Sequence, residues 1–98
     1  MDMDNALERR REERFLSNDP IRWKRPGKIE DEKGWLIDTA DSGMGFLTLQ
    51  SSAPEIGDVL NIRRQDGDIW ATIERTVRVA RSTPTTNGQF AMVGCTLQ

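Results

Sequence analysis

The fold of this chain is decided by the stretch Ile37-Asp38-Thr39-Ala40-Asp41-Ser42-Gly43-Met44-Gly45-Phe46-Leu47-Thr48-Leu49. In its middle, Asp41-Ser42-Gly43 has the composition of a tight turn, because Asp, Ser and Gly each stabilise turn conformations of the backbone. A compact apolar run, Gly34–Thr39, precedes the turn, and a second one, Gly45–Leu49, follows it. We therefore predict two neighbouring strands that pair in antiparallel fashion across this turn.

Further strands are indicated on both sides of this hairpin by apolar residues that alternate with polar ones. Turn signals separate them, of which Pro26-Gly27, Asp66-Gly67 and Asn87-Gly88 are the clearest. The additional predicted strands are Ile21–Arg25, Val59–Arg64, Ile69–Ala80 and Phe90–Leu97. Six short strands with frequent turns predict an all-β fold, a small six-stranded antiparallel β-barrel, because closure removes the edges that an open sheet would expose.

A chain of 98 residues suffices for one such domain with one modest core. We assign residues 20–98 to the barrel and residues 1–19 to an N-terminal arm. Within the arm, Ala6–Leu16 has helix-forming composition, although it has too few apolar residues for a core-facing stripe. We expect a flexible or partly helical arm that Phe15-Leu16 anchors to the barrel and that orders fully when an anion binds.

The residue types that are missing exclude several kinds of chemistry. The chain has no histidine, so it has no histidine base, catalytic triad or histidine metal ligand. Its single cysteine, Cys95, can form neither an internal disulfide nor a cysteine-cluster zinc site. Cys95 lies in an alternating apolar run, which predicts a buried structural thiol. We therefore expect no enzymatic activity, no metal and no cofactor.

No membrane or secretion segment is visible in the sequence. No apolar run approaches the roughly 18 residues that span a bilayer. The acidic segment Met1–Asp4 lacks the apolar region of a secretory signal. We expect a cytoplasmic protein that has no contact with a membrane.

Positive charge is concentrated near the N-terminus of an acidic chain. The formal net charge is −2, yet residues 9–28 contain eight basic and three acidic residues. Such a local excess favours a site for a small anion over a long nucleic-acid footprint, which goes with a basic domain. Polymeric nucleic acid is therefore not the partner that we expect.

The arginine-rich run Arg9–Arg14 and the carboxylate of Asp38 together suit an anionic ligand that carries guanine. Arginine can donate a bidentate pair of hydrogen bonds to the O6/N7 edge of guanine. An ionised aspartate has only acceptors, so it can accept from the N1–H and N2–H donors of the same base. The remaining arginines, and backbone N–H groups around a glycine turn, suit phosphate.

With these motifs the chain resembles the PilZ family, bacterial six-stranded barrels that bind the second messenger cyclic di-GMP. The family has an Arg-x-x-x-Arg pair in an N-terminal arm, which Arg10 and Arg14 match here. Its second motif, Asp/Asn-x-Ser/Ala-x-x-Gly, is matched by Asp38, Ala40 and Gly43. The similarity extends over nearly the whole chain.

The resemblance implies a non-enzymatic bacterial receptor whose arm closes on cyclic di-GMP and so remodels a surface for a downstream protein partner. Arg10 and Arg14 would clasp guanine and phosphate. Asp38 would hold the Watson–Crick edge of guanine, and Gly43 would let the backbone approach the ligand. Arg9, directly before the arginine pair, is of the kind that the family links to binding two stacked ligand molecules.

Two further positions bear on the strength of binding. Ala40 stands where serine is commoner, and the missing hydroxyl removes a hydrogen bond worth about 0.5–1.5 kcal/mol, which weakens binding without abolishing it. Arg78, on the predicted penultimate strand, could stack its guanidinium on a base.

Each motif also has a purely structural interpretation. The arginines could form a solvated helix face, Asp38 could cap the turn, and Gly43 could be chosen for a positive φ. Two functional alternatives stay open beside the receptor. One is a ligand-free adaptor that binds a protein through a surface bearing Trp23, Trp35 or Trp70, and the other is a small nucleic-acid-binding barrel with a basic arm.

Overall fold

The computed structural model describes residues 15–66 and 69–98 of the chain. Seven β-strands and one short 3-10 turn make up the regular structure of this part. The strands are β1 (Phe15–Leu16), β2 (Pro20–Lys24), β3 (Glu32–Ala40), β4 (Gly43–Leu49), β5 (Val59–Asp66), β6 (Ile69–Pro84) and β7 (Phe90–Leu97), and the 3-10 turn is η1 (Gln50–Ser52). Among the described residues, no helix is long and apolar enough to cross a membrane.

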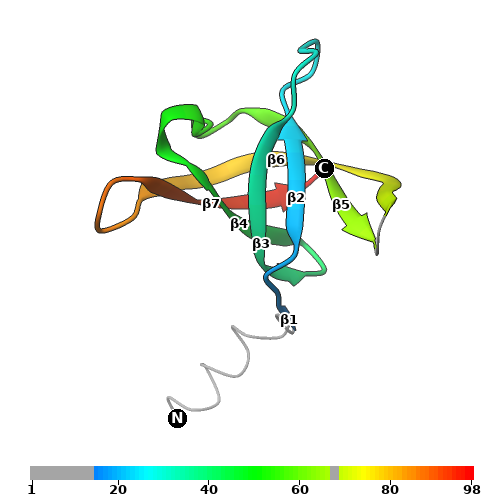
Figure 1. Ribbon diagram of the computed structural model, residues 1–98, viewed down its shortest axis with the longest axis horizontal. Helices are drawn as coiled ribbons and strands as arrows, with labels where there is room; N and C mark the ends of the chain where they lie inside the picture. The colour runs from blue at the N-terminus through cyan, green and yellow to red at the C-terminus, as the bar shows by residue number, and fades with distance from the viewer. Residues whose placement is uncertain (1–14, 67–68) are drawn as a thin grey trace.

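Strands β2 to β7 form a closed antiparallel barrel. Their order is β3-β2-β5-β6-β7-β4, and an additional pairing of β3 with β4 closes the sheet on itself. Figure 1 shows β2 and β3 in front, crossing β4, β6 and β7 behind them. The predicted six-stranded antiparallel barrel is therefore confirmed, with strand ends that differ from the prediction by a few residues.

The short strand β1 adds to the barrel beside the end of β3. Phe15 pairs with Thr39 and Leu16 pairs with Asp38, both in antiparallel register. Leu16 takes part in this attachment through its backbone, since it is 85% exposed. The helix expected over Ala6–Leu16 is thus replaced by strand at Phe15–Leu16, and its other residues lie outside the described part of the chain.

The core is built from the inward-facing residues of all six barrel strands. The rings of Trp23 and Phe46 pack at its centre with centroids 5.9 Å apart. The buried apolar residues are Ile21, Trp23, Leu36, Met44, Phe46, Leu60, Ile62, Val77, Val79, Ala91, Val93 and Cys95. Cys95 is buried as predicted, and desolvation raises the pKa of its thiol to about 12.

The hairpin turns follow the glycine signals of the sequence. Gly27 and Gly88 have φ angles of 82° and 72°, in the left-handed region that glycine adopts without steric cost. The N–H of Gly88 donates to the carbonyl of Thr85 at 2.9 Å, which closes the turn between β6 and β7. The β5–β6 hairpin is confirmed by the direct pairing of Asp66 with Ile69.

Candidate functional site

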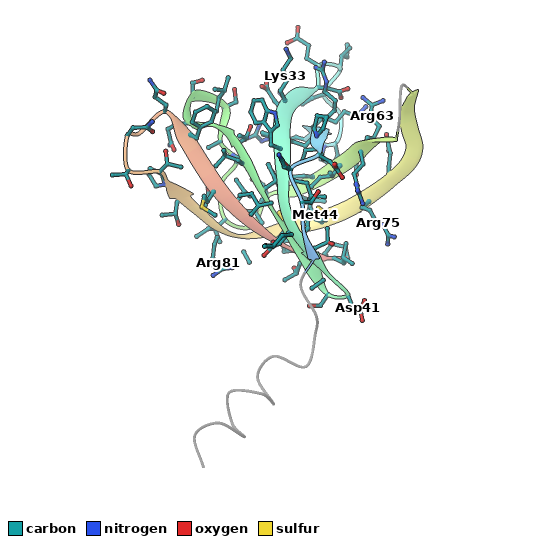
Figure 2. The ribbon with its side chains drawn as sticks, turned by 60° about the horizontal axis from the view of Figure 1, so that its bottom comes forward. Lys33, Asp41, Met44, Arg63, Arg75 and Arg81 are labelled. Atoms are coloured by element: carbon teal, nitrogen blue, oxygen red, sulfur yellow. The ribbon has the colours of Figure 1, made fainter. Side chains whose placement is uncertain are left out.

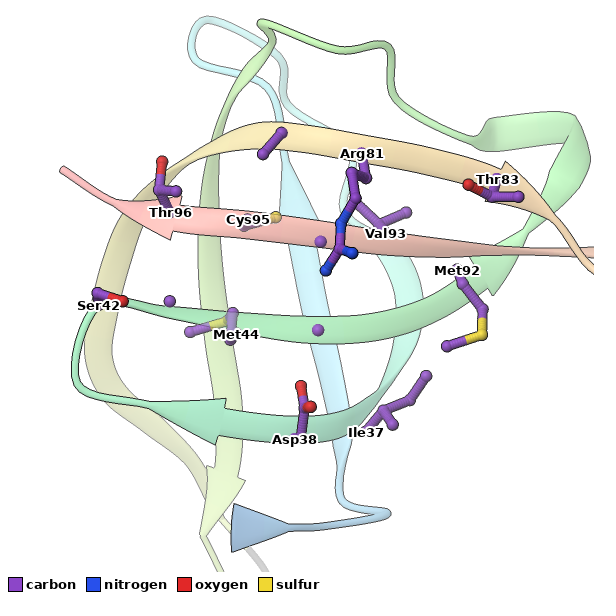
Figure 3. Close-up of a pocket in the computed structure, with 14 residues that line it drawn as sticks. Ile37, Asp38, Ser42, Met44, Arg81, Thr83, Met92, Val93, Cys95 and Thr96 are labelled. Atoms are coloured by element: carbon purple, nitrogen blue, oxygen red, sulfur yellow. The ribbon is translucent and has the colours of Figure 1, made fainter. Parts of the chain in front are cut away.

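A groove of about 380 Å³ lies on the outer face of the barrel, across β3, β4, β7 and β6 (Figure 3). Its volume falls in the range of about 300–1,000 Å³ that small-molecule sites occupy. Both charged side chains that line it, Asp38 and Arg81, are delivered by the outer strands of this group, β3 and β6. The groove therefore has a carboxylate on one side and a guanidinium on the other.

Two β-bulges place these charges on the outer face. The register shifts between Leu36 and Asp38 on β3, and again between Val79 and Arg81 on β6. A bulge inserts one extra residue, so the side chains after it change faces relative to strict alternation. Without the first bulge, Asp38 would follow buried Leu36 at a spacing of two and would point into the core.

The floor of the groove is a pair of glycines. Gly45 on β4 and Gly94 on β7 are direct partners, and Asp38 and Arg81 pair with them from either side. A β-carbon at Gly45 would stand 2.7 Å from Oδ1 of Asp38. One at Gly94 would stand 3.1 Å from Nε of Arg81. The two glycines thus leave room for the carboxylate and the guanidinium to lie over the strands.

The orientation of Arg81 follows from three distances. The β-carbon position of Gly94 is 3.1 Å from Nε and 3.2 Å from Nη2, but 3.6 Å from Cζ. Because both nitrogens are nearer than the carbon that joins them, the Nε/Nη2 edge of the guanidinium faces Gly94. Figure 3 shows the outer end of the group extending across β7 toward β4, with the carboxylate of Asp38 pointing toward β4 from the other side.

Arg81 is an available cation in this groove. Its side chain is exposed, and within the part of the chain that the structure describes it has no hydrogen bond or ion pair. Other arginines on the barrel form ion pairs. Nε of Arg25 lies 3.4 Å from Oδ2 of Asp58, and Nη2 of Arg64 lies 2.6 Å from Oδ2 of Asp19. Arg63 is paired with Asp31. Arg81 can therefore meet an anion or a carbonyl edge without first breaking an ion pair among these residues.

Apolar and hydroxyl-bearing side chains line both ends of the groove. Ile37, Met92 and Thr83 lie toward one end, and Met44, Ser42 and Thr96 lie toward the other (Figure 3). Apolar side chains beside a carboxylate and a guanidinium suit a ligand with a flat apolar ring and polar edges, such as a nucleobase.

The structure brings together some of the residues that the sequence singles out. Asp38 and Gly43 line the groove, and Ala40 is the partner of Gly43 in the adjoining strand without lining the groove itself. Arg78 does not line it; its exposed side chain donates from Nη1 to the carbonyl of Gly57 at 3.1 Å. The arm residues Arg9, Arg10 and Arg14 lie outside the described residues.

Gly43 has a role that the sequence did not reveal. Its φ is not positive, so the interpretation that a left-handed turn requires glycine here is wrong. A β-carbon at this position would stand 2.2 Å from the carbonyl oxygen of Cys95 on β7. Glycine is needed because β4 and β7 approach each other too closely at the rim of the groove for any side chain.

The pairing of β1 with β3 places the residue that follows Arg14 in the sequence beside the Asp38 motif. Phe15 pairs with Thr39, the residue after Asp38. Arg14 is joined covalently to Phe15, and consecutive α-carbons are about 3.8 Å apart. The described part of the chain therefore begins beside the Asp38 motif.

Within residues 15–66 and 69–98, no group of three potential metal-ligating side chains is found. A comparison of the chain with models of known protein families returns no match, and a comparison with curated proteins returns none either.

Proposed function

We propose that this domain is a PilZ-type receptor that binds cyclic di-GMP and has no enzymatic activity of its own, in the cytoplasm of a bacterium. Asp38 accepts hydrogen bonds from guanine, and Arg10 and Arg14 of the arm bind guanine and phosphate. Arg9 determines whether one or two stacked ligand molecules bind. Closure of the arm alters the surface that a downstream protein recognises.

One observation carries this proposal: the Asp38-to-Gly43 motif lies at a groove of nucleotide size, and β1, which directly follows the arginine-rich run in the sequence, pairs with β3 at this motif. Asp38 and Gly43 line the groove, while the β1–β3 pairing ends at Thr39. A carboxylate with neighbouring arginines offers acceptors to guanine and donors to phosphate. Neither motif alone would define a site for such a ligand.

The affinity that follows is modest. Ordering the six residues from Arg9 to Arg14 costs about 1–2 kcal/mol each in backbone entropy. Charge-assisted hydrogen bonds, worth about 1.5–3 kcal/mol each, offset this cost. We therefore expect a Kd in the micromolar range.

Calorimetric titration of cyclic di-GMP into the whole chain tests the proposal, with GTP as the competing nucleotide. Asp38→Ala and Arg10→Ala should each lose at least about tenfold in affinity, since each removes a charge-assisted contact. Asp41→Ala is the matched control, because Asp41 is an exposed carboxylate in the same turn that does not line the groove. Unchanged binding by Asp38→Ala would rule out the assigned role of that carboxylate.

A second candidate function is favoured by apolar side chains on the outer face of β3, β4 and β7. Trp35, Leu49 and Met92 are 38%, 45% and 49% exposed. Trp35 and Met92 both pair with Leu47, and the ring of Phe90 lies 6.1 Å from that of Trp35. Exposed apolar patches of this kind mark protein-binding surfaces.

The adaptor alternative predicts a partner without a nucleotide. An NMR spectrum unchanged by excess cyclic di-GMP, together with loss of a captured partner on Trp35→Ser, would support it. Of the other tryptophans, Trp23 is fully buried and cannot serve in such a surface.

A further inference from the structure

Arg81 and Asp38 face each other across the glycine pair in one register row, Asp38–Gly45–Gly94–Arg81. Three strand spacings of about 4.8 Å separate the outer two strands. Both side chains lean inward over the glycines, as the distances to the β-carbon positions of Gly45 and Gly94 indicate. The row is therefore a slot with donors at one wall, acceptors at the other and backbone as its floor.

We propose that Arg81 reads the O6/N7 edge of a guanine whose N1–H and N2–H edge is held by Asp38, so that the barrel alone selects the base. This inference rests on the proposed binding of cyclic di-GMP, and it assigns one guanine of the ligand to the barrel alone. The arm arginines Arg10 and Arg14 then bind the phosphates and the other guanine.

The geometry of Arg81 supports this assignment. Its Nε/Nη2 edge is turned to Gly94, which leaves the Nη1/Nη2 end directed toward β4 and Asp38 (Figure 3). Two parallel N–H groups at this end match two neighbouring acceptors, as in the O6/N7 edge of guanine. Adenine has a donor at the position of O6 and would be rejected by the same fork.

Gly94 sets the position of Arg81 in this slot. A β-carbon there would stand 3.1 Å and 3.2 Å from two guanidinium nitrogens, and the nearest atoms around it all belong to Arg81. An alanine at this position should therefore displace Arg81 while meeting little else. In a chain that lacks the Arg81 side chain, the same alanine should have no effect.

Ligand analogues test the contacts of Arg81 and Asp38 separately. We propose calorimetric titration of the whole chain with cyclic di-GMP, with its 7-deaza analogue, which lacks the N7 acceptor, and with its inosine analogue, which lacks the N2 donor. The wild type should bind the 7-deaza analogue about 5- to 150-fold more weakly than cyclic di-GMP. Arg81→Ala should bind cyclic di-GMP and the 7-deaza analogue with equal affinity, and it should still prefer cyclic di-GMP to the inosine analogue.

The complementary variants sharpen the result. Asp38→Ala should lose discrimination against the inosine analogue and keep discrimination against the 7-deaza analogue. Gly94→Ala should lose discrimination against the 7-deaza analogue, as Arg81→Ala does. The double variant Gly94→Ala/Arg81→Ala should bind cyclic di-GMP no more weakly than Arg81→Ala alone. Arg75→Ala is the control, since Arg75 is exposed on the same strand but lies on a different side of the barrel (Figure 2).

The outcomes distinguish this inference from the function on which it rests. If the wild type binds cyclic di-GMP but Arg81→Ala keeps the full 7-deaza penalty, another residue reads N7 and the inference is overturned alone. A wild type that is indifferent to the 7-deaza change overturns it equally. A wild type that binds none of the three nucleotides overturns both the receptor and the slot.

Discussion

Thr48 is the single buried polar side chain among those that the structure describes, and it joins three strands. Its hydroxyl accepts from Nε1 of Trp23 at 3.1 Å and donates to the carbonyl of Lys33 at 2.7 Å. Thr48→Val keeps the shape but leaves a buried N–H and a carbonyl unpaired, which should lower the free energy of unfolding by about 1–3 kcal/mol.

Urea denaturation measures this loss, and Thr76→Val is the control. Thr76 is exposed and its hydroxyl donates to Oδ1 of Asn61 at 3.3 Å, so its replacement should change stability by less than about 0.5 kcal/mol. Equal losses in the two variants would mean that the buried hydroxyl contributes nothing beyond its volume.

Cys95 gives the fold a pH dependence at the alkaline side. Burial raises the pKa of its thiol from 9.0 to about 12, so the folded state holds the proton more tightly than the unfolded state does. The stability from this group is complete below about pH 9 and is lost as pH rises toward about 12. Between about pH 8 and pH 10.5, wild type should lose more unfolding free energy in urea than Cys95→Val, in which the thiol is absent. Parallel losses would contradict the burial effect.

At the scale of the strand, the bulges explain why the sequence pointed to one arginine and the structure to another. Val77 and Val79 are buried in strict alternation, which made Arg78 the outward cation of β6. The bulge at Ala80 then turns Arg81 outward opposite Gly94, and no turn residue or change of pattern announces it. Asp38, by contrast, could be identified from its motif, although not from alternation.

This difference between the two arginines is testable. Arg81→Ala should weaken cyclic di-GMP binding by about 5- to 150-fold, as expected for loss of a bidentate contact with a base. Arg78→Ala should lose less, because that guanidinium bonds to the carbonyl of Gly57 and does not line the groove. Calorimetry on both variants measures these losses of affinity. A greater loss in Arg78→Ala than in Arg81→Ala would mean that Arg78, the residue indicated by the sequence, contacts the ligand.

Gly43 and Gly45 of β4 have different atoms next to them, so replacing each with alanine should have a different effect on stability and on ligand affinity. Gly43→Ala sets a β-carbon against the backbone carbonyl of Cys95 and should force β4 from β7, at a cost of about 1–3 kcal/mol or more. In Gly45→Ala the one close contact of the β-carbon is with the carboxylate of Asp38 at 2.7 Å, while the backbone carbonyl of Val93 stands at an ordinary contact distance of 3.7 Å. Gly45→Ala should therefore keep most of the stability and lose ligand affinity. Urea denaturation and calorimetry separate the two effects, and equal destabilisation would contradict this account.

For the molecule as a whole, alternation and turn chemistry were enough to predict a closed barrel. Each strand buries one face, and the glycine turns at Gly27 and Gly88 set the hairpins, so local signals and the global fold agree. The groove could not be predicted from these local signals. It depends on two bulges and on a Gly45–Gly94 pair whose members are far apart in sequence and meet only when β4 pairs with β7.

The proposed closure of the arm on the ligand predicts how ligand affects the stability of the entire domain. A ligand that binds only the folded state adds about 2.7 kcal/mol to the unfolding free energy at 100 times its Kd. For a domain of this size each kcal/mol raises Tm by about 4–8 °C. Saturating cyclic di-GMP should therefore raise Tm by roughly 10–20 °C in the wild type. Arg14→Ala should lose most of this rise and Arg75→Ala should keep it, as measured by differential scanning calorimetry. A rise that survives Arg14→Ala unchanged would mean that the groove binds the nucleotide without the arm.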